Sequence, residues 1–128
     1  MTSEPLSILV VDDNPSMAKT LADILGAKGF EVCAAYSGTE ALEMFKDRPF
    51  DILLTDVKMP DMNGVTLFRQ TRQTHPKLVT ILMTAYAADE IIQQGIAEGI
   101  KTVLTKPLDI EFLISLFSAY KRLIQDEM

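Results

Sequence analysis

The fold is organised around the stretch Phe50-Asp51-Ile52-Leu53-Leu54-Thr55-Asp56-Val57-Lys58-Met59-Pro60. Its apolar run, 52–54, is typical of a buried strand, and the carboxylate of Asp56 stands where that run stops. Pro60, Asn63 and Gly64 then predict a turn. In an open parallel α/β sheet, ligands bind just beyond the carboxyl ends of the strands. Asp56 therefore either begins a turn or takes part in chemistry, and the rest of the chain decides between the two.

Short apolar or β-branched runs alternate along the chain with segments whose apolar residues recur at helical spacing. Strands are expected over 7–11, 31–36, 51–56, 78–83 and 102–105. Helices are expected from Pro15 to a stop at Gly29, from the capping box 37–40, over 64–73, over 88–98 and from Asp109 to about 124. Strands that alternate with helices imply a parallel sheet covered on both faces, and right-handed crossovers leave few topologies.

Length and composition narrow the class of protein. The chain has 128 residues, which predicts one domain over 1–128 with a core of about 6–124. No apolar run approaches the ~20 residues of a membrane span, and the first residues show no signal peptide. The single cysteine, Cys33, suits a reducing cytoplasm, where we expect the protein to act. A net charge of −6 argues against direct nucleic-acid binding by this domain.

Four of the expected strands end in polar residues of complementary kinds, namely Asp12 and Asp13, Asp56, Thr84 and Lys106. Parallel strands bring these ends to one edge, where carboxylates at ~4 Å repel by about 4 kcal/mol per pair at an effective dielectric near 20. A divalent cation relieves that repulsion, and oxygen ligands favour Mg²⁺. A lysine and a hydroxyl nearby fit a phosphoryl group that is held on an acid.

Four motifs in this order and spacing carry a resemblance to a known family. They are Val11-Asp12-Asp13, Leu54-Thr55-Asp56 followed by Met59-Pro60 and Gly64, Met83-Thr84-Ala85, and Lys106-Pro107. The chain resembles the receiver domains of two-component response regulators over about residues 6–124. The resemblance implies a flavodoxin-like, doubly wound (βα)5 fold with a five-stranded parallel sheet in the strand order 2-1-3-4-5.

The resemblance also implies a phosphoacceptor and a metal site. Asp56 would accept a phosphoryl group from a phosphohistidine on a sensor histidine kinase or a histidine phosphotransfer protein. Asp13, Asp56 and the backbone carbonyl of Lys58 would ligate Mg²⁺, and Asp12 would act through water. Mn²⁺ is expected to substitute for Mg²⁺. The domain would be a regulatory switch rather than an enzyme, assisting its own phosphorylation and slow dephosphorylation.

Further residues are expected to bind and read the phosphoryl group. By the resemblance Lys106 would pair with its oxygens, and Thr84 would move to bond them, aided by the backbone N–H groups of Lys58 and Ala85. The bond from Lys106 to Pro107 is expected to be cis. The switch would then alter the surface of the fourth helix, fifth strand and fifth helix, where a downstream effector, an output domain or a second copy would bind.

Two positions depart from the usual family pattern. Many receivers carry an aromatic residue three positions before the lysine, where Val103 stands here, so the switch works either through Thr84 and the backbone or with the help of Tyr86. Lys58 and Tyr86 each lie two residues beyond a site residue and are expected to flank the phosphoryl group. Their bulk predicts a comparatively long-lived aspartyl phosphate.

Other classes of function fit the sequence less well. An aspartate-nucleophile phosphohydrolase normally has a second aspartate two residues after the first, where Lys58 stands here. A nucleotide- or flavin-binding module needs a glycine-rich first loop, which Asp12-Asp13-Asn14-Pro15 is not. A degenerate receiver acting as a scaffold is disfavoured because all the expected site residues are present. The only histidine, His75, precedes a proline and is expected to be an exposed helix terminator.

Overall fold

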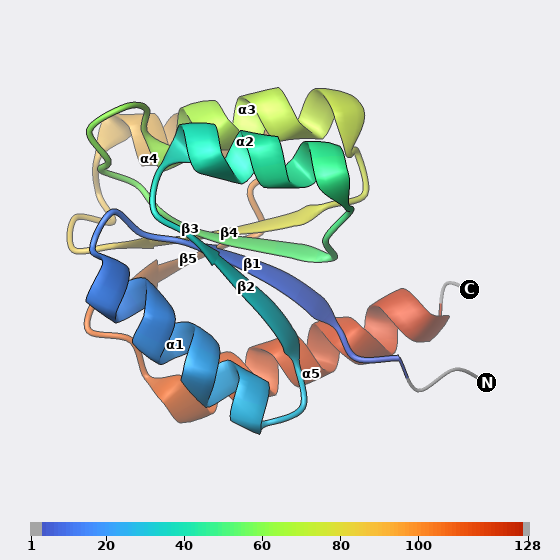
Figure 1. Cartoon of the computed structure of the whole chain (residues 1–128). Helices are drawn as coiled ribbons and strands as arrows, with labels where there is room; N and C mark the ends of the chain where they lie inside the picture. The colour runs from blue at the N-terminus through green and yellow to red at the C-terminus, as the bar shows by residue number, and fades with distance from the viewer. Residues whose placement is uncertain (1–3, 127–128) are drawn as a thin grey trace.

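The computed structural model describes residues 4–126 and is shown in Figure 1. Strands and helices alternate as β1 (Ser7–Val11), α1 (Pro15–Ala27), β2 (Glu31–Ala35), α2 (Gly38–Asp47), β3 (Ile52–Asp56), α3 (Gly64–Thr74), β4 (Val79–Thr84), α4 (Glu90–Glu98), β5 (Thr102–Thr105) and α5 (Ile110–Asp126). All the strands pair in parallel, in the order β2-β1-β3-β4-β5. The predicted fold and strand order are thereby confirmed. Residues 1–3, over which the sequence predicts no signal peptide, lie outside the described part of the chain.

Helices cover both faces of the sheet. In Figure 1, α1 and α5 lie on one face, and α2, α3 and α4 lie on the other. Successive strand residues point to opposite faces. Ile8, Val10 and Leu54 accordingly pack with the α1 and α5 side chains, whereas Leu9 and Leu53 pack with those of α2 and α3. Within residues 4–126, no helix has the length and apolar character of a membrane span.

Most element boundaries lie within two residues of the predicted ones. Asn14 caps α1 by accepting from the N–H groups of Ser16 and Met17, and the stop at Gly29 has a φ of +96°, which glycine adopts without strain. Met17, Leu21, Ile24 and Leu25 recur at the spacing of one helical face, which predicts that Met17 points inward; this is wrong, because Met17 is 54% exposed. The buried positions of α1 are Ala18, Leu21 and Leu25, so the core-facing stripe begins one residue later.

The last helix is also less buried than its apolar residues suggest. Leu113 and Phe117 are buried against the sheet, and Leu116, Tyr120 and Ile124 are partly buried there. Phe112 and Leu123 are exposed. A single helix in contact with one sheet buries only a stripe of its surface, so the broad apolar face of α5 is wider than the sheet can cover.

The first turn of α2 is completed by a residue from a distant loop. Asp61, between β3 and α3, accepts hydrogen bonds from the N–H groups of Gly38 at 3.2 Å and Thr39 at 2.8 Å, and from the Thr39 hydroxyl at 2.8 Å. The pKa of Asp61 is lowered to about 2, mainly by the hydrogen bond from the Thr39 N–H. The Thr39 hydroxyl and the Gly38 N–H lower it further. The ionised carboxylate also sits favourably at the positive end of the helix dipole.

We predict that Asp61→Ala lowers the free energy of unfolding by about 1 kcal/mol at pH 7, the usual cost of losing a helix cap. Because the pKa of Asp61 is lower in the folded state, the ionised carboxylate stabilises the fold at pH values above 3.8, the ordinary pKa of this group. This contribution is lost as the pH falls toward about 2. Urea denaturation at several pH values measures the difference in the free energy of unfolding between the wild type and Asp61→Ala. A difference that does not become smaller below pH 3.8 contradicts this role of the charge.

Candidate functional site

The sheet brings three charged side chains together at its carboxyl edge. Val10, Leu54 and Leu104 lie on β1, β3 and β5 and all pack on the face covered by α1 and α5. The residues two positions further along the chain are Asp12, Asp56 and Lys106. Because side chains alternate with a period of two, each of the three charged groups continues the same side of its strand. Their meeting therefore follows directly from the strand register.

Lys106 lies between two of the carboxylates. Its Nζ is 3.1 Å from Oδ2 of Asp56 and 3.5 Å from Oδ2 of Asp12. The side chains of Asp12, Asp56 and Lys106 are 5%, 13% and 29% exposed. The backbone N–H of Lys106 also donates to the Thr84 carbonyl at 2.8 Å, which extends the pairing of β4 and β5 up to the lysine. Lys106 is therefore held both at its backbone, by Thr84, and at its ammonium group, by the two carboxylates.

Burial and charge shift the pKa values of this pair. Burial raises the pKa of the Asp56 carboxyl, and the hydrogen bond and charge of Lys106 offset that effect only in part. Burial alone would lower the pKa of Lys106, but its hydrogen bond to Asp56 and the charges of Asp56 and Asp12 outweigh burial, so the pKa is raised. Lys106 therefore remains protonated at neutral pH, and it lies beside the Asp56 carboxylate, which is poorly solvated by water.

Asp13 completes a cluster of carboxylates. Asp12, Asp13 and Asp56 each offer one oxygen, and these oxygens all lie within 4.8 Å of one another. Asp12 is held in place because its Oδ1 accepts from the Asn14 N–H at 3.0 Å, whereas Asp13 is exposed. Three carboxylates against one ammonium leave an excess of negative charge. A set of hard oxygen donors around that charge is the donor chemistry that Mg²⁺ prefers, so these residues fit such an ion.

Thr84 lies at the end of β4, beyond the apolar residue Leu82, which packs on the α3 and α4 side of the sheet. Its hydroxyl is buried and accepts from the Tyr86 N–H at 3.0 Å. Among the described residues, no hydrogen bond joins Thr84 to Asp56. Ala85, whose N–H is the expected partner of a phosphoryl group, is exposed at the same edge. Thr84 is thus tied to the loop that leads into α4.

Two exposed side chains meet above the sheet edge. Nζ of Lys58, from the loop after β3, lies 4.6 Å from the centre of the Tyr86 ring, from the loop after β4. Tyr86 is 59% exposed. The sequence predicts that both residues flank the site, but nothing in it indicates their mutual cation–π contact. Val103 packs among the apolar residues between the sheet and the helices α3 and α4.

The Lys106–Pro107 peptide bond is cis. A small apolar groove of about 200 Å³ begins beside Lys106 and Asp12 and runs between α1 and the loop before α5. Met17, the exposed residue of the first turn of α1, contributes to its wall. The apolar groove therefore adjoins the charged group at the sheet edge.

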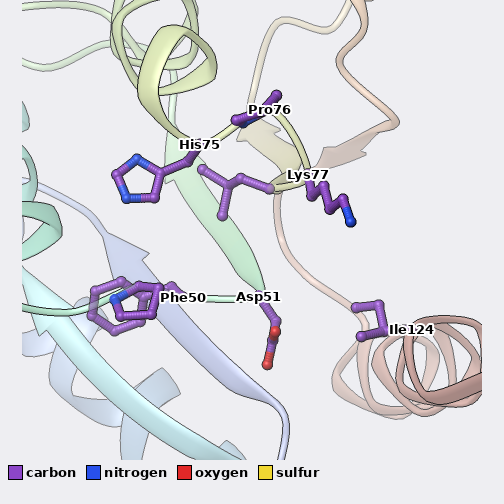
Figure 2. A pocket seen from close by; sticks show the side chains of 8 residues that line it. Phe50, Asp51, His75, Pro76, Lys77 and Ile124 are labelled. Carbon is purple, nitrogen blue, oxygen red and sulfur yellow. The ribbon is translucent and has the colours of Figure 1, made fainter. Parts of the chain in front are cut away.

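His75 lies away from these residues. It follows α3 and precedes β4, so it stands at the edge of the sheet where the strands begin, whereas Asp56 stands where β3 ends. Figure 2 shows it with Phe50, Asp51, Lys77 and Ile124 around a hollow of about 480 Å³ at that edge. His75 does terminate α3, but it is half-buried, with its ring 5.0 Å from that of Phe45, so the prediction that it is exposed is wrong.

The fold is a parallel α/β sandwich with three carboxylates and a lysine at the carboxyl ends of its strands. The family model of the response regulator receiver domain matches residues 8–118. The chain therefore belongs to the response regulator receiver domain family, as the sequence motifs predict.

Two similar proteins come from Escherichia coli. The transcriptional regulatory protein ZraR of Escherichia coli O157:H7 is 36% identical over 113 residues, which are 88% of this chain and 26% of ZraR. The sensor histidine kinase RcsC of Escherichia coli is 36% identical over 118 residues, which are 92% of this chain and 12% of RcsC. The chain thus spans only a minor part of either relative.

Solved structures resemble the whole fold. The response regulator receiver domain protein (CheY-like) of Methanospirillum hungatei JF-1 has a TM-score of 0.90 at 27% identity, over 97% of this chain and 99% of that one. The response regulator protein TrrA of Thermotoga maritima, solved in complex with Mg²⁺ and BeF, has a TM-score of 0.78 at 26% identity, over 90% of this chain and 98% of that one. A relative with this fold thus binds Mg²⁺ and a beryllium fluoride.

Proposed function

We propose that this chain is a phosphorylation-dependent switch of two-component signalling and that Asp56 is its phosphoacceptor. The observation that carries the proposal is the pairing of the half-buried Asp56 with Lys106 inside a group of three carboxylates. The expected donor is a sensor histidine kinase or a histidine phosphotransfer protein. We further propose that residues 1–128 form a single domain that acts in the cytoplasm.

In the proposed reaction, a carboxylate oxygen of Asp56 forms a bond to phosphorus while the P–N bond of the donor phosphohistidine breaks. The electron pair of that bond stays on the imidazole, which leaves as the neutral ring after protonation. Such in-line transfer needs positioning and charge neutralisation more than covalent chemistry. Lys106 already lies 3.1 Å from the acceptor carboxylate, so it can follow the charge onto the phosphoryl oxygens without a large rearrangement.

Asp13, Asp56 and the Lys58 carbonyl are the proposed ligands of Mg²⁺, with Asp12 acting through water. A bound Mg²⁺, for which Mn²⁺ is expected to substitute, would neutralise the carboxylates and the phosphoryl oxygens together. Asp12 is already restrained by the Asn14 N–H and by Lys106, so it needs little reordering to hold such a water.

Thr84 is the proposed reader of the phosphoryl group. Its hydroxyl now bonds the Tyr86 N–H, so a turn toward a phosphoryl oxygen, joined there by the N–H groups of Lys58 and Ala85, would release the loop before α4. The N-terminal end of α4 is suited to follow, because its cap residue Asp89 makes no side-chain capping bond. Val103 leaves no aromatic ring to move inward, so the loop and Tyr86 are the proposed route of the switch.

The surface formed by α4, β5 and α5 is the proposed output. The exposed apolar side chains Ile96 on α4 and Phe112 and Leu123 on α5 support this assignment. A downstream effector, an output domain or a second copy of the chain would bind there after phosphorylation. The opposite end of α4 is fastened by Arg69 and Arg72, which lie 2.6 and 3.1 Å from the Glu98 carboxylate.

An aspartate-nucleophile phosphohydrolase is a second class of function with an acid at the end of a strand. Such an enzyme requires an acid–base group beside the nucleophile to activate water. The position two residues after Asp56 holds Lys58, whose amine lies over the Tyr86 ring. A cation engaged with an aromatic ring is poorly suited to remove a proton from water, which favours a stable acyl phosphate over turnover.

We predict that the wild-type protein gains the mass of one phosphate when it is incubated with Mg²⁺ and acetyl phosphate. Asp56→Asn should gain none because it lacks the attacking carboxylate, and chelation of Mg²⁺ should weaken the reaction. Intact mass spectrometry measures the modification. An unmodified wild-type protein that also fails to bind beryllofluoride would contradict the switch assignment.

We also predict that Lys58→Asn and Tyr86→Ala shorten the lifetime of the phosphorylated protein. Each variant breaks the cation–π contact, worth about 0.5–1 kcal/mol at an exposed site. If that energy holds a cover over the phosphoryl group, the loss of phosphate should be about two- to fivefold faster. The decay is followed by intact mass after removal of the donor.

Lys101→Asn is the matched control for the lifetime measurement, because Lys101 is an exposed lysine before β5, at the opposite edge of the sheet. It should leave the decay rate unchanged. Decay at the wild-type rate in both Lys58→Asn and Tyr86→Ala would exclude the shielding role.

A further inference from the structure

The loop between β3 and α3, residues 57–63, is fastened to the rest of the fold at two places. At its ends, the Gly64 N–H donates to the Val57 carbonyl at 2.8 Å. In its middle, Asp61 holds the N-terminus of α2. Lys58, whose carbonyl is a proposed ligand of Mg²⁺, lies between these two fastenings. The position of that carbonyl therefore depends on how firmly the loop is held.

The hydrogen bonds of the first turn of α2 make the Asp61 contact specific. The N–H groups of Gly38 and Thr39 donate to Asp61, and the N–H of Glu40 donates to the Ser37 hydroxyl at 3.0 Å. The first N–H groups of a helix have no partner inside the helix, so each needs an acceptor from elsewhere. One acceptor is the hydroxyl of Ser37, the residue just before α2. Two further N–H groups, of Gly38 and Thr39, donate to Asp61, which lies 23 and 22 positions away from them in sequence.

Packing reinforces the same contact. Gly38 is buried, and a Cβ atom added to it would overlap the side chain of Met62, the residue after Asp61. Gly64, the residue that follows the loop, is also closely packed, because a Cβ on it would overlap the carbonyl oxygen of Asp56, the residue before the loop. Both glycines thus allow a close approach, of the Met62 side chain to α2 and of the start of α3 to the Asp56 carbonyl.

We infer that Asp61 is a positioning residue for the metal site, because it ties the loop to α2 and so keeps the Lys58 carbonyl aligned with Asp13 and Asp56. This inference rests on the proposed function, in which these three groups hold Mg²⁺. Groups that orient the ligands of a metal typically change its affinity by about 10- to 100-fold when they are removed. Asp61 lies outside the ligand set and acts only through the loop.

The test is calorimetric titration of the intact chain with Mg²⁺ at pH 7. Asp61→Ala should weaken Mg²⁺ binding by about tenfold. Asp61→Asn should fall between this variant and the wild type, because its amide oxygen can still accept one of the bonds. Hydrogen exchange of the amides of residues 58–62 should be faster in Asp61→Ala, which reports the loop directly.

Ser37→Ala is the matched control, because the Ser37 hydroxyl caps the same helix by accepting from the Glu40 N–H, a bond that does not involve the loop. It should lose a similar stability of about 1 kcal/mol and keep the wild-type affinity for Mg²⁺. If Asp61→Ala binds Mg²⁺ as tightly as the wild type, or if Ser37→Ala binds as weakly as Asp61→Ala, the positioning role is overturned.

Two further outcomes are decisive. If Asp61→Ala does not fold, Asp61→Asn takes its place, and wild-type affinity in that variant overturns the inference. A wild-type protein that does not bind Mg²⁺ overturns the proposed metal site itself, which separates failure of the proposed function from failure of the role of Asp61.

Discussion

The ammonium of Lys106 between the carboxylates of Asp12 and Asp56 is the interaction on which the site depends. It joins the ends of β1, β3 and β5, and it neutralises part of the charge that these strands concentrate at one edge. Asp13 leaves the cluster with more negative than positive charge. The same arrangement leaves a set of oxygen donors that fits a divalent cation, and in the proposed function Lys106 would pair with the phosphoryl oxygens.

Much of this arrangement is predictable from local sequence patterns. Short apolar runs mark the strands, and the caps at Asn14 and Asp109 mark helix starts that the structure contains. In a parallel sheet the ends of the strands share an edge, so polar residues that follow apolar runs must meet. Asp12, Asp56 and Lys106 fall on one side because each follows a core residue by two positions.

Contacts between loops are not predictable in this way. The bond from Asp61 to α2 and the contact of Lys58 with Tyr86 join segments that lie more than 20 residues apart. Nothing in the periodicity of either segment indicates such a partner. Helical spacing likewise cannot tell the centre of an apolar stripe from its flank, so Met17 and Phe112 are exposed although their spacing favours burial. These exceptions lie near the site or on the helices that would meet partners.

The loops thus add what the sheet alone lacks. The sheet register assembles the charges, Lys58 contacts the Tyr86 ring beside them, and Asp61 joins the segment between β3 and α3 to the start of α2. Thr84 links the charged edge to α4 through the Tyr86 N–H. In the proposed function, the acceptor site and the transmission of its state therefore belong to different parts of the structure.

The most direct measurement is to locate the phosphoryl group chemically. After reaction with acetyl phosphate and Mg²⁺, borohydride reduces an aspartyl phosphate to homoserine, and peptide mass spectrometry identifies the modified position. The account predicts homoserine at position 56 alone. Homoserine at position 12 or 13, or phosphate retained on His75, would contradict it.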